Sequence, residues 1–344
     1  MKTHRQLFPI IGIFAALFFQ SLETCTAAEP FIFGADVSWV QQQENEGRKF
    51  SCGGTNADFF AIMRDHGFNW IRLRIFNEPK NRGGYSRQGY CDLPHTLAFA
   101  KRVKAAGFKL LLDFHYSDTW ADPQKQIRPL AWRNLDDAAT AKAVGDYTRE
   151  TLAAFKAQNT PPEMVQIGNE IANGFLWREG ETNHLKNFDP FCANLKSGIA
   201  AVRETDPKIR VMLHVDCGGS NGKSRWFFDN VIKRGVNFDV IGLSFYTQWH
   251  GSPDNLKSNV TDLAKRYEQP IIVVEYSVPT IREVNDIVHG LPNGKGLGTF
   301  IWEPTGWPHG DNPALFEKDG RAKPELELYP QMSRDYSRVP ITGR

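Results

Sequence analysis

The chain has 344 residues, which is enough for one large domain or two smaller ones. Its apolar and charged fractions, 41% and 23%, are ordinary for a globular protein. A net charge of +2 argues against both a nucleic-acid partner and an acidic membrane surface as the main binding target.

The first 28 residues have the pattern of a secretory signal peptide. Two basic residues precede an apolar run from Leu7 to Phe19, and small residues follow up to Ala28, where we expect cleavage. The apolar run is too short to span a bilayer comfortably, so we expect no membrane attachment after cleavage. A lipoprotein site before Cys25 is the alternative, but Glu23 and Thr24 are poor residues for one. We therefore expect a secreted mature chain, residues 29–344, that is extracellular or, in a Gram-negative cell, periplasmic.

Eight short apolar runs, rich in β-branched and aromatic residues, recur through the mature chain. Most are continuous rather than alternating, which is typical of parallel strands that are covered on their outer face. The predicted strands are residues 31–39, 69–76, 108–116, 163–170, 210–216, 238–246, 270–277 and 296–304.

Helical patterns fill the intervals between these runs. They cover residues 57–67, 96–107, 136–158, 190–204, 225–235, 254–267 and, more weakly, 280–290. Strand and helix thus alternate through about 300 residues, which predicts an α/β fold, a single (β/α)8 TIM barrel. A doubly wound open sheet is the alternative, but it favours a Gly-rich phosphate loop after its first strand, and none follows Trp39.

Polar side chains stand at the carboxyl end of every predicted strand, where a barrel of this kind carries its active site. Polar residues that merely end strands would be of scattered types. They would not be expected to include two Glu, two Arg, two His and several aromatic residues at one rim. We predict that ten of these rim residues bind substrate: Asp36, Arg74, His115, Asp118, Trp120, Asn169, His214, Asp216, Tyr246 and Trp302.

Glu170 and Glu275 differ from the other rim residues because an apolar strand leads directly into each. Glycoside hydrolysis needs two carboxyl groups across the scissile bond, one as a proton donor and one as a nucleophile or base. The two positions are 105 residues apart (275 − 170), about three strand–helix units, so we expect them to lie on opposite sides of the barrel mouth. A ring of structural salt bridges is the competing interpretation.

The neighbours of the two glutamates fit such chemistry. Arg72 or Arg74 could hold the nucleophile ionised and Tyr246 could donate a hydrogen bond to it, and both effects lower a carboxyl pKa. Asn169, next to Glu170, can donate to a sugar hydroxyl.

The block DFHYSDTWADPQKQIRPLAW, residues 113–132, closely resembles the third-strand signature of the arabinogalactan endo-β-1,4-galactanases, glycoside hydrolase family 53. GADVSW, RLRIFNEP, VQIGNEIANGFLW, LHVDCGG, GLSFYTQWHG, VVEYS and FIWEPTGW resemble the family in the same order, from about Phe33 to past Trp307. The resemblance implies a retaining enzyme that cuts β-1,4-galactan internally, with Glu170 as acid/base and Glu275 as nucleophile. A carboxyl separation of roughly 5–5.5 Å is then expected.

The chain departs from the family pattern in two places. Tyr276 follows Glu275, where the family commonly has Thr, and the segment from Tyr276 to Lys295 is short, with Asp286 as its one aspartate. Some bacterial members hold calcium in a long loop there, so we expect no metal and no cofactor. Both departures leave the length of the products open.

Other classes of protein fit less well. A metal-dependent barrel hydrolase needs His on its first strand, which this chain lacks. A non-catalytic sugar-binding protein keeps the aromatic residues but has no need for both glutamates. A mannanase or cellulase with the same carboxylates is the closest rival, and the 113–132 block separates it from a galactanase. The sequence leaves open the oligomeric state, for which we expect a monomer, and glycosylation at Asn259.

Cleavage after Ala28 leaves four cysteines, for which three pairings exist. Unpaired thiols are also possible, since export does not force oxidation. Cys52 and Cys91 flank the loops after the first two predicted strands, so we expect them to form one disulfide and Cys192 and Cys217 to form the other.

Overall fold

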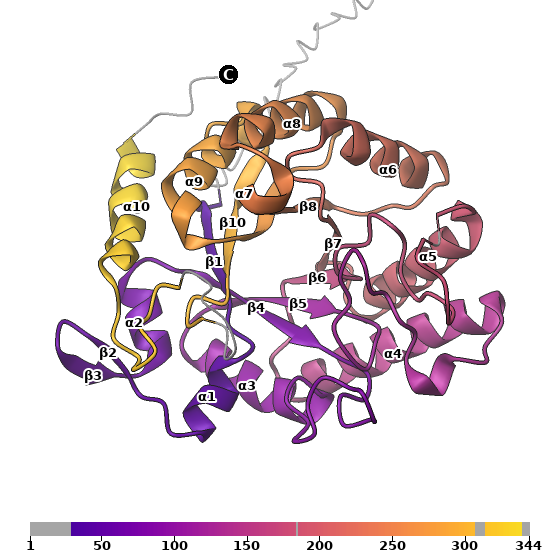
Figure 1. Ribbon diagram of the computed structural model, residues 1–344, viewed down its shortest axis with the longest axis horizontal. Helices are drawn as coiled ribbons and strands as arrows, with labels where there is room; N and C mark the ends of the chain where they lie inside the picture. The colour runs from indigo at the N-terminus through magenta and orange to yellow at the C-terminus, as the bar shows by residue number, and fades with distance from the viewer. Residues whose placement is uncertain (1–28, 184, 307–313, 339–344) are drawn as a thin grey trace, which may run out of the picture. The chain divides into compact units, whose positions relative to one another are not determined.

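Eight parallel strands close into a barrel in the computed structural model, which describes residues 29–183, 185–306 and 314–338 (Figure 1). The order around the barrel is β1-β10-β9-β8-β7-β6-β5-β4, and β4 pairs with β1 to close it. Each predicted run contains one strand, so the predicted (β/α)8 barrel is confirmed. The strands are β1 (Ile32–Asp36), β4 (Trp70–Ile75), β5 (Lys109–Phe114), β6 (Met164–Ile167), β7 (Arg210–Val215), β8 (Val240–Phe245), β9 (Ile271–Tyr276) and β10 (Gly296–Trp302).

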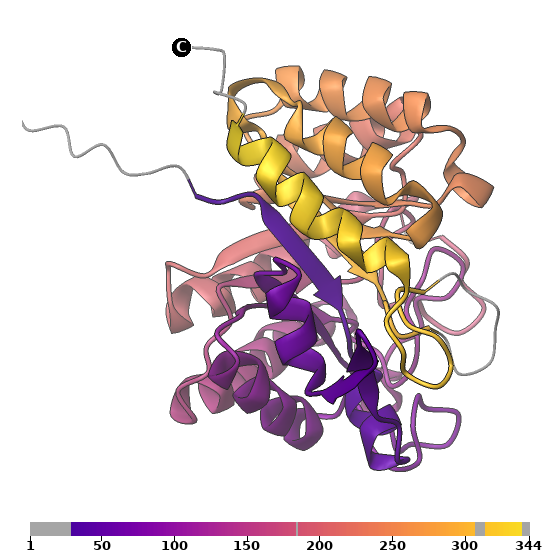
Figure 2. The same cartoon turned by 90° about the vertical axis from the view of Figure 1, so that its left-hand side faces the viewer.

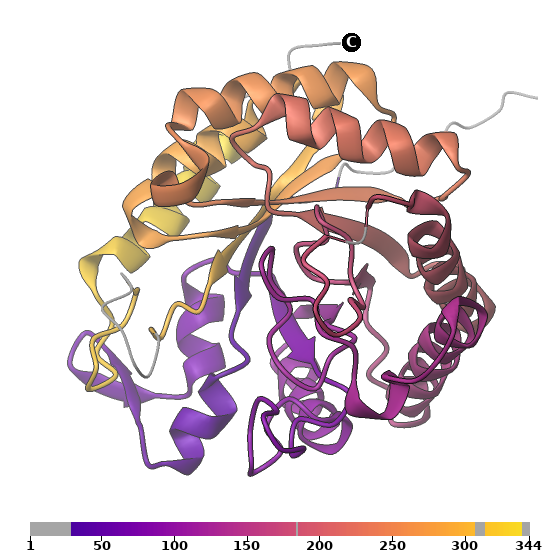
Figure 3. The same ribbon diagram turned by 45° about the vertical axis from the view of Figure 1, so that its right-hand side comes forward.

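Helices follow the strands and surround the barrel (Figures 1 and 3). Seven were predicted: α2 (Phe59–Asp65), α3 (Leu93–Ala105), α4 (Asp137–Ala157), α5 (Phe188–Thr205), α6 (Asn221–Lys233), α8 (Pro253–Arg266) and α9 (Ile281–His289). Three of them begin where an Asp side chain accepts a hydrogen bond from a free backbone N–H, at Asp58, Asp92 and Asp136. None of the described helices is long and apolar enough to cross a membrane.

Shorter elements and the last helix were not predicted. They are α1 (Val40–Asn45), α7 (Thr247–His250), α10 (Leu328–Arg338), the hairpin of β2 (Phe50–Cys52) and β3 (Thr55–Ala57), and the 3-10 turns Leu130–Trp132, Val278–Thr280, Pro292–Gly294 and Pro324–Glu327. Helix α10 runs alongside β1 (Figure 2), where Tyr329 and Tyr336 both contact the ring of Phe33. It thereby covers the outer face of the first strand, as the eighth barrel helix must.

The interior of the barrel is filled in layers, because alternate residues of each strand point inward. One layer is apolar and consists of Ile32, Trp70, Leu111, Met164, Met212, Val240, Ile272, Val274 and Phe300. Gly34 packs against Phe300 of this layer. Any larger residue would clash there, because a β-carbon at position 34 would lie 2.3 Å from the Phe300 ring. The apolar layer is a solid floor beneath the polar residues that follow it along the strands.

The four cysteines among the described residues are free thiols, so both predicted disulfides are wrong. Cys91 is buried close enough to the Arg74 guanidinium to feel its charge, whereas Cys52 lies against His66, with 3.9 Å between Sγ and Nε2. Cys217 faces Asp216. The location of Cys52 and Cys91 in the loops after neighbouring strands was therefore not enough to bring their sulfur atoms together.

From Phe31 onward the described residues form one compact unit. The predicted signal peptide, residues 1–28, lies outside the described residues and stays a prediction.

Candidate active site

Glu275 enters the barrel mouth through an irregularity in β9. Ile272 and Val274 already point into the barrel, so regular alternation would turn Glu275 outward. The pairing with β8 shifts between Leu243 and Ser244, so that Ser244 pairs with Glu275 and one residue of β9 is skipped. Such a bulge changes the direction of a side chain, and here it directs a carboxylate into the site.

Glu170 reaches the site through a tight turn after β6. Gly168 and Glu170 both have positive φ angles, 83° and 49°, the second of which is uncommon for a residue with a side chain. Gln126 holds the turn from outside, since its Nε2 donates to the Asn169 carbonyl at 2.7 Å. Strain of this kind is frequent at functional sites, where surrounding contacts maintain it.

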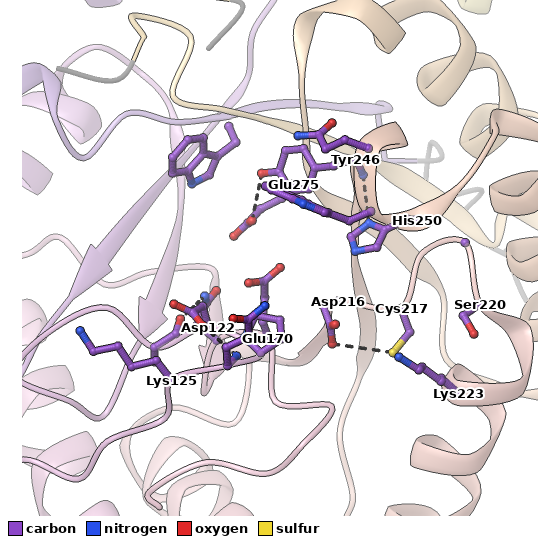
Figure 4. Close-up of a pocket in the computed structure, with 18 of the residues that line it drawn as sticks. Asp122, Lys125, Glu170, Asp216, Cys217, Ser220, Lys223, Tyr246, His250 and Glu275 are labelled. Carbon is purple, nitrogen blue, oxygen red and sulfur yellow. Dashed lines mark hydrogen bonds between the residues drawn. The ribbon is translucent and has the colours of Figure 1, made fainter. Parts of the chain in front are cut away.

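The carboxyl groups of Glu170 and Glu275 point toward one another across the cavity (Figure 4). One oxygen of each lies within 4.8 Å of the other. That spacing is close to the value of about 5–5.5 Å typical of retaining glycosidases, and shorter than the ~6.5–9.5 Å that leaves room for a water molecule in inverting ones.

The two carboxyl groups differ in their hydrogen-bond donors. Glu275 Oε1 accepts from Arg72 Nη1 at 2.8 Å, and Oε2 accepts from the Tyr246 hydroxyl at 3.1 Å and from Ser244 Oγ at 3.3 Å. Burial raises the pKa of Glu275, and Arg72 opposes that rise without cancelling it. Arg72 thus lowers this pKa, as expected from the sequence, but burial has the larger effect.

Glu170 has the stronger tendency to keep its proton. Burial raises its pKa well above the ordinary range, and the negative charges of Glu275 and Asp216 raise it further. Of the pair, Glu170 is thus the carboxylic acid, and Glu275, with its three donors, is the group suited to carry the charge.

Arg72 organises the polar layer beneath the pair. Its guanidinium is fully buried and donates to Asp36, Asp113 and Glu275 at 2.8–2.9 Å, and also to Asn169 Oδ1 at 2.9 Å. Burial works against the charge of Arg72, but the three carboxylates raise its pKa above the ordinary value. One permanently charged side chain therefore fixes the position of Glu275 and of the residue that precedes Glu170.

An open cavity of about 1430 Å³ surrounds the two glutamates. Asp122 and Lys125 lie on one side of Glu170, and Asp216, Cys217, Ser220 and Lys223 lie on the other (Figure 4). Trp120, Trp249 and Trp302 line the same cavity, and Trp249 is 72% exposed. An open cavity of this size with aromatic walls suits a chain of sugars, whose apolar faces stack on indole rings.

Comparisons with known proteins identify the family. The model of glycosyl hydrolase family 53 matches residues 32–282. The chain belongs to glycoside hydrolase family 53. It is 35% identical over 313 residues to an endo-β-1,4-galactanase of Bacillus subtilis, with 81% of this chain and 71% of the relative covered. It is 37% identical over 258 residues to an arabinogalactan endo-β-1,4-galactanase of Cellvibrio japonicus, with coverages of 73% and 66%.

A solved family 53 structure agrees with the fold. The catalytic domain from Ignisphaera aggregans superimposes with a TM-score of 0.80 at 35% identity, and the match covers 87% of this chain and 95% of that one. The protein is therefore a glycoside hydrolase, as the sequence resemblance predicted.

The predicted sugar-binding residues of this family 53 hydrolase fall into two groups. Seven of them line the cavity: Arg74, His115, Trp120, Asn169, Asp216, Tyr246 and Trp302. Asn169 donates through Nδ2 to the Ala121 carbonyl at 2.8 Å, which leaves its second N–H for a sugar hydroxyl.

Asp36, Asp118 and His214 do not line the cavity, so the structure does not support direct sugar binding by them. Asp36 is fully buried between Arg72 and Arg74. Asp118 fixes neighbouring loops by accepting the backbone N–H groups of Glu78 and Leu130. His214 is buried beneath the pair, with Nε2 2.7 Å from Ser244 Oγ. These three polar side chains support the site from behind.

Several residues of the site were not among those predicted. Asp113 and Gln166 lie inside strands and complete the network around Arg72. A polar residue within an otherwise apolar strand was the available signal for both. Lys223 and Ser220 come from the start of α6, and nothing in their local sequence distinguishes them from ordinary surface residues.

By distance alone, Glu170, His214 and Glu275 could hold a metal ion, and this is the one such group among the residues that the structure describes. Both ring nitrogens of His214 already face protein groups, Ser244 on one side and Gln166 with Asn169 on the other. Two members of this group, Glu170 and Glu275, are the candidate catalytic carboxylates, so their closeness needs no metal to explain it.

Proposed function

We propose that this hydrolase is an endo-β-1,4-galactanase that cleaves β-1,4-galactan, as in the type I arabinogalactan side chains of pectin, with retention of configuration. The observation that carries the proposal is the carboxylate pair, Glu170 and Glu275, with oxygens within 4.8 Å of each other in an open aromatic groove. The printed names of the relatives from Bacillus subtilis and Cellvibrio japonicus support galactan as the substrate.

The first step uses both carboxyl groups. Glu275 Oε attacks the anomeric carbon while the bond from that carbon to the leaving sugar oxygen breaks, and the Glu170 proton passes to this oxygen. Arg72, Tyr246 and Ser244 hold Glu275 in place, so little reorganisation is needed at that moment. The product is a covalent galactosyl ester of Glu275 and a shortened chain with a new hydroxyl.

The second step reverses the roles. Glu170, now ionised, removes a proton from a water molecule, and the water oxygen attacks the anomeric carbon as the ester bond to Glu275 breaks. Two displacements at one carbon restore the β configuration, and Glu170 regains its proton for the next cycle.

The groove supports internal cleavage of a polymer rather than removal of terminal units. It continues past the pair in both directions, toward Asp122 and Lys125 on one side and toward Ser220 and Lys223 on the other. Export through the sequence-predicted signal peptide and action as a monomer, outside the cell or in the periplasm, complete the proposal.

A reducing-sugar assay on purified β-1,4-galactan, β-mannan and cellulose tests the proposal. We expect release from galactan alone, with a mixture of short oligosaccharides rather than free galactose. Degradation of mannan or cellulose with galactan untouched would reject it, and release of galactose units alone would reject the endo mode.

A further inference from the structure

The ring of His250, at the end of α7, stands in the wall of the cavity, and its two nitrogens have different surroundings. Nδ1 accepts the backbone N–H of Tyr246 at 3.0 Å (Figure 4). Because a backbone N–H can only donate, Nδ1 carries no hydrogen, and the neutral ring carries its hydrogen on Nε2. The protein itself thus fixes which edge of His250 is a hydrogen-bond donor.

The Nε2 edge of His250 is accessible and unused by the protein. No hydrogen bond joins this nitrogen to another described residue, and it is not enclosed, in contrast to Nε2 of His115. The side chain is half-buried and lines the cavity, so a molecule that fills the cavity can reach this edge. An accessible donor of fixed direction in a substrate cavity is suited to orient the ligand.

The backbone around His250 holds the ring in one place. The N–H groups of Trp249 and His250 both donate to the Tyr246 carbonyl, at 3.0 and 2.8 Å, which closes a tight turn. The loop after β7 packs against this turn, since a β-carbon at Gly219 would lie 1.5 Å from the His250 carbonyl oxygen. The donor is therefore preorganised, and binding a ligand there costs little side-chain entropy.

The charges near His250 favour a neutral ring and a neutral ligand. Burial and the positive charge of Lys223 lower the pKa of His250 to about 4, so the ring is uncharged at neutral pH. Asp216 and Lys223 line the same part of the cavity, so an ion of either sign would meet a like charge there. A sugar hydroxyl is uncharged and can accept a hydrogen bond from an imidazole N–H.

Three kinds of sugar contact occur together in this part of the cavity. Trp249, the residue before His250, is 72% exposed and offers an aromatic face. Asp216 offers a carboxylate that can accept from a sugar hydroxyl, and His250 offers the donor. An aromatic face with an acceptor and a donor beside it matches a sugar ring, which has an apolar face and hydroxyl edges.

This part of the cavity adjoins the catalytic pair. Tyr246, whose backbone His250 holds, donates its hydroxyl to Glu275 Oε2 at 3.1 Å. Burial and the charge of Glu275 raise the pKa of Glu170, and the charge of Asp216 raises it further, so Asp216 lies close to the proton donor. A sugar held by His250 is therefore close to the bond that is cleaved.

We propose that His250 binds substrate by donating its Nε2 hydrogen to an oxygen of the sugar unit that lies on the Asp216 side of the catalytic pair. This inference rests on the proposed function and deepens it, because it adds a residue that binds the galactan chain beside the two glutamates. The bond from the Tyr246 N–H to Nδ1 serves the same end, since it keeps the hydrogen of the ring on Nε2.

Two substitutions separate the roles of the two ring nitrogens. Asn places its carbonyl oxygen near the position of Nδ1, so His250→Asn keeps an acceptor for the Tyr246 N–H but removes the Nε2 donor. Gln reaches as far as Nε2 and carries an NH₂ group there, so His250→Gln keeps a donor but loses the Nδ1 acceptor. Both are made in a Glu275→Gln protein, which lacks the nucleophile, so that binding is measured without turnover.

Calorimetric titration with β-1,4-galactohexaose measures the affinity of each variant. We expect His250→Asn to raise Kd about three- to tenfold, the range for loss of a hydrogen bond between neutral groups, with a nearly unchanged melting temperature. His250→Gln should keep Kd within about twofold but lower the melting temperature, because the Tyr246 N–H loses its partner. His289→Asn is the matched control, since its ring stacks on Tyr336 outside the cavity, and it should leave Kd unchanged.

Nitrogen NMR of the Glu275→Gln protein with isotope-labelled histidines tests the geometry directly, and His250→Asn assigns the signal by its loss. We expect a neutral His250 ring with its hydrogen on Nε2 at neutral pH. Addition of galactohexaose should shift the Nε2 signal, because this nitrogen then donates to a sugar oxygen instead of water. A purely structural role of His250 predicts no such shift.

Several results would overturn the proposal. An unchanged Kd in His250→Asn, or an equal rise of Kd in both His250 variants together with lower melting temperatures, would leave His250 a structural role only. A hydrogen on Nδ1, or an Nε2 signal that galactohexaose does not move, would reject the donor itself. These results leave galactanase activity standing. If galactohexaose does not bind and the wild-type enzyme does not attack galactan, the proposed function fails, and this inference fails with it.

Discussion

At the scale of single residues, the most direct prediction concerns the different roles proposed for Glu170 and Glu275. Glu275→Ala should abolish turnover of galactan, and added azide should restore the cleavage of an aryl galactobioside by attacking from the vacated side, giving an azide of inverted configuration. Glu170→Ala should lower galactan hydrolysis by about 10²–10⁴ and affect an activated aryl substrate far less, since that leaving group hardly needs a proton. If both variants behave alike on the activated substrate, the roles are wrongly assigned.

The raised pKa of Glu170 has a consequence for the pH profile. Its proton is needed in the first step, and burial together with Glu275 holds that pKa well above the ordinary range. Activity on galactan should therefore persist through neutral pH and fall as the pH rises through the raised pKa. The alkaline fall of kcat/KM should be absent when the wild-type enzyme is assayed on the activated aryl substrate, because that leaving group hardly needs the Glu170 proton. An equal alkaline fall on both substrates would assign it to another group.

Glu303 links a pKa to stability. Its pKa is about 8 in the folded protein, against 4.5 for an exposed Glu, because burial outweighs the opposing effect of Arg74. The folded state then binds more protons than the unfolded state between these values, so the free energy of unfolding should fall as the pH rises from about 4.5 to 8. Glu303→Gln should flatten this slope, as measured by urea denaturation at several pH values. An equal slope in both proteins would show that Glu303 is already ionised.

At the scale of secondary-structure elements, the layered barrel interior sets what each strand tolerates. Gly34→Ala in β1 should destabilise the protein by about 1–3 kcal/mol, because the new β-carbon would lie 2.3 Å from the Phe300 ring. Gly222→Ala is the control, since it lies in α6 with nothing within 4 Å of the added carbon, and it should be neutral or stabilising by up to about 1 kcal/mol. Thermal melts that rank the two variants the other way would contradict this packing.

The strands could be predicted from sequence, whereas several side-chain positions could not. All eight apolar runs became barrel strands because burial on both faces leaves an unmistakable pattern. The β2–β3 hairpin is short and polar and gave no such signal. Asp118 stands at a strand end like Asp216, yet it turns to loop N–H groups, and only tertiary contacts decide between these directions. For the same reason the bulge that brings Glu275 inward is visible only in the paired strands.

At the scale of the whole molecule, the barrel is held together without covalent links among its described residues. Cys52, Cys91, Cys192 and Cys217 are free, so a reducing agent should leave the melting temperature unchanged. The denatured mature protein should react with four equivalents of a thiol reagent without prior reduction. A lower melting temperature in reductant, together with fewer reactive thiols, would restore a disulfide.

The whole account depends on galactan being cut internally with retention by Glu170 and Glu275. Proton NMR of β-1,4-galactan during the first minutes of digestion tests this in one measurement, because the anomeric signals report both whether new reducing ends appear and in which configuration. We expect β-anomeric reducing ends of oligosaccharides first, with the α-anomer growing later by mutarotation. Reducing ends that appear first as the α-anomer, or galactan left intact by an enzyme that digests β-mannan or cellulose, would contradict the account.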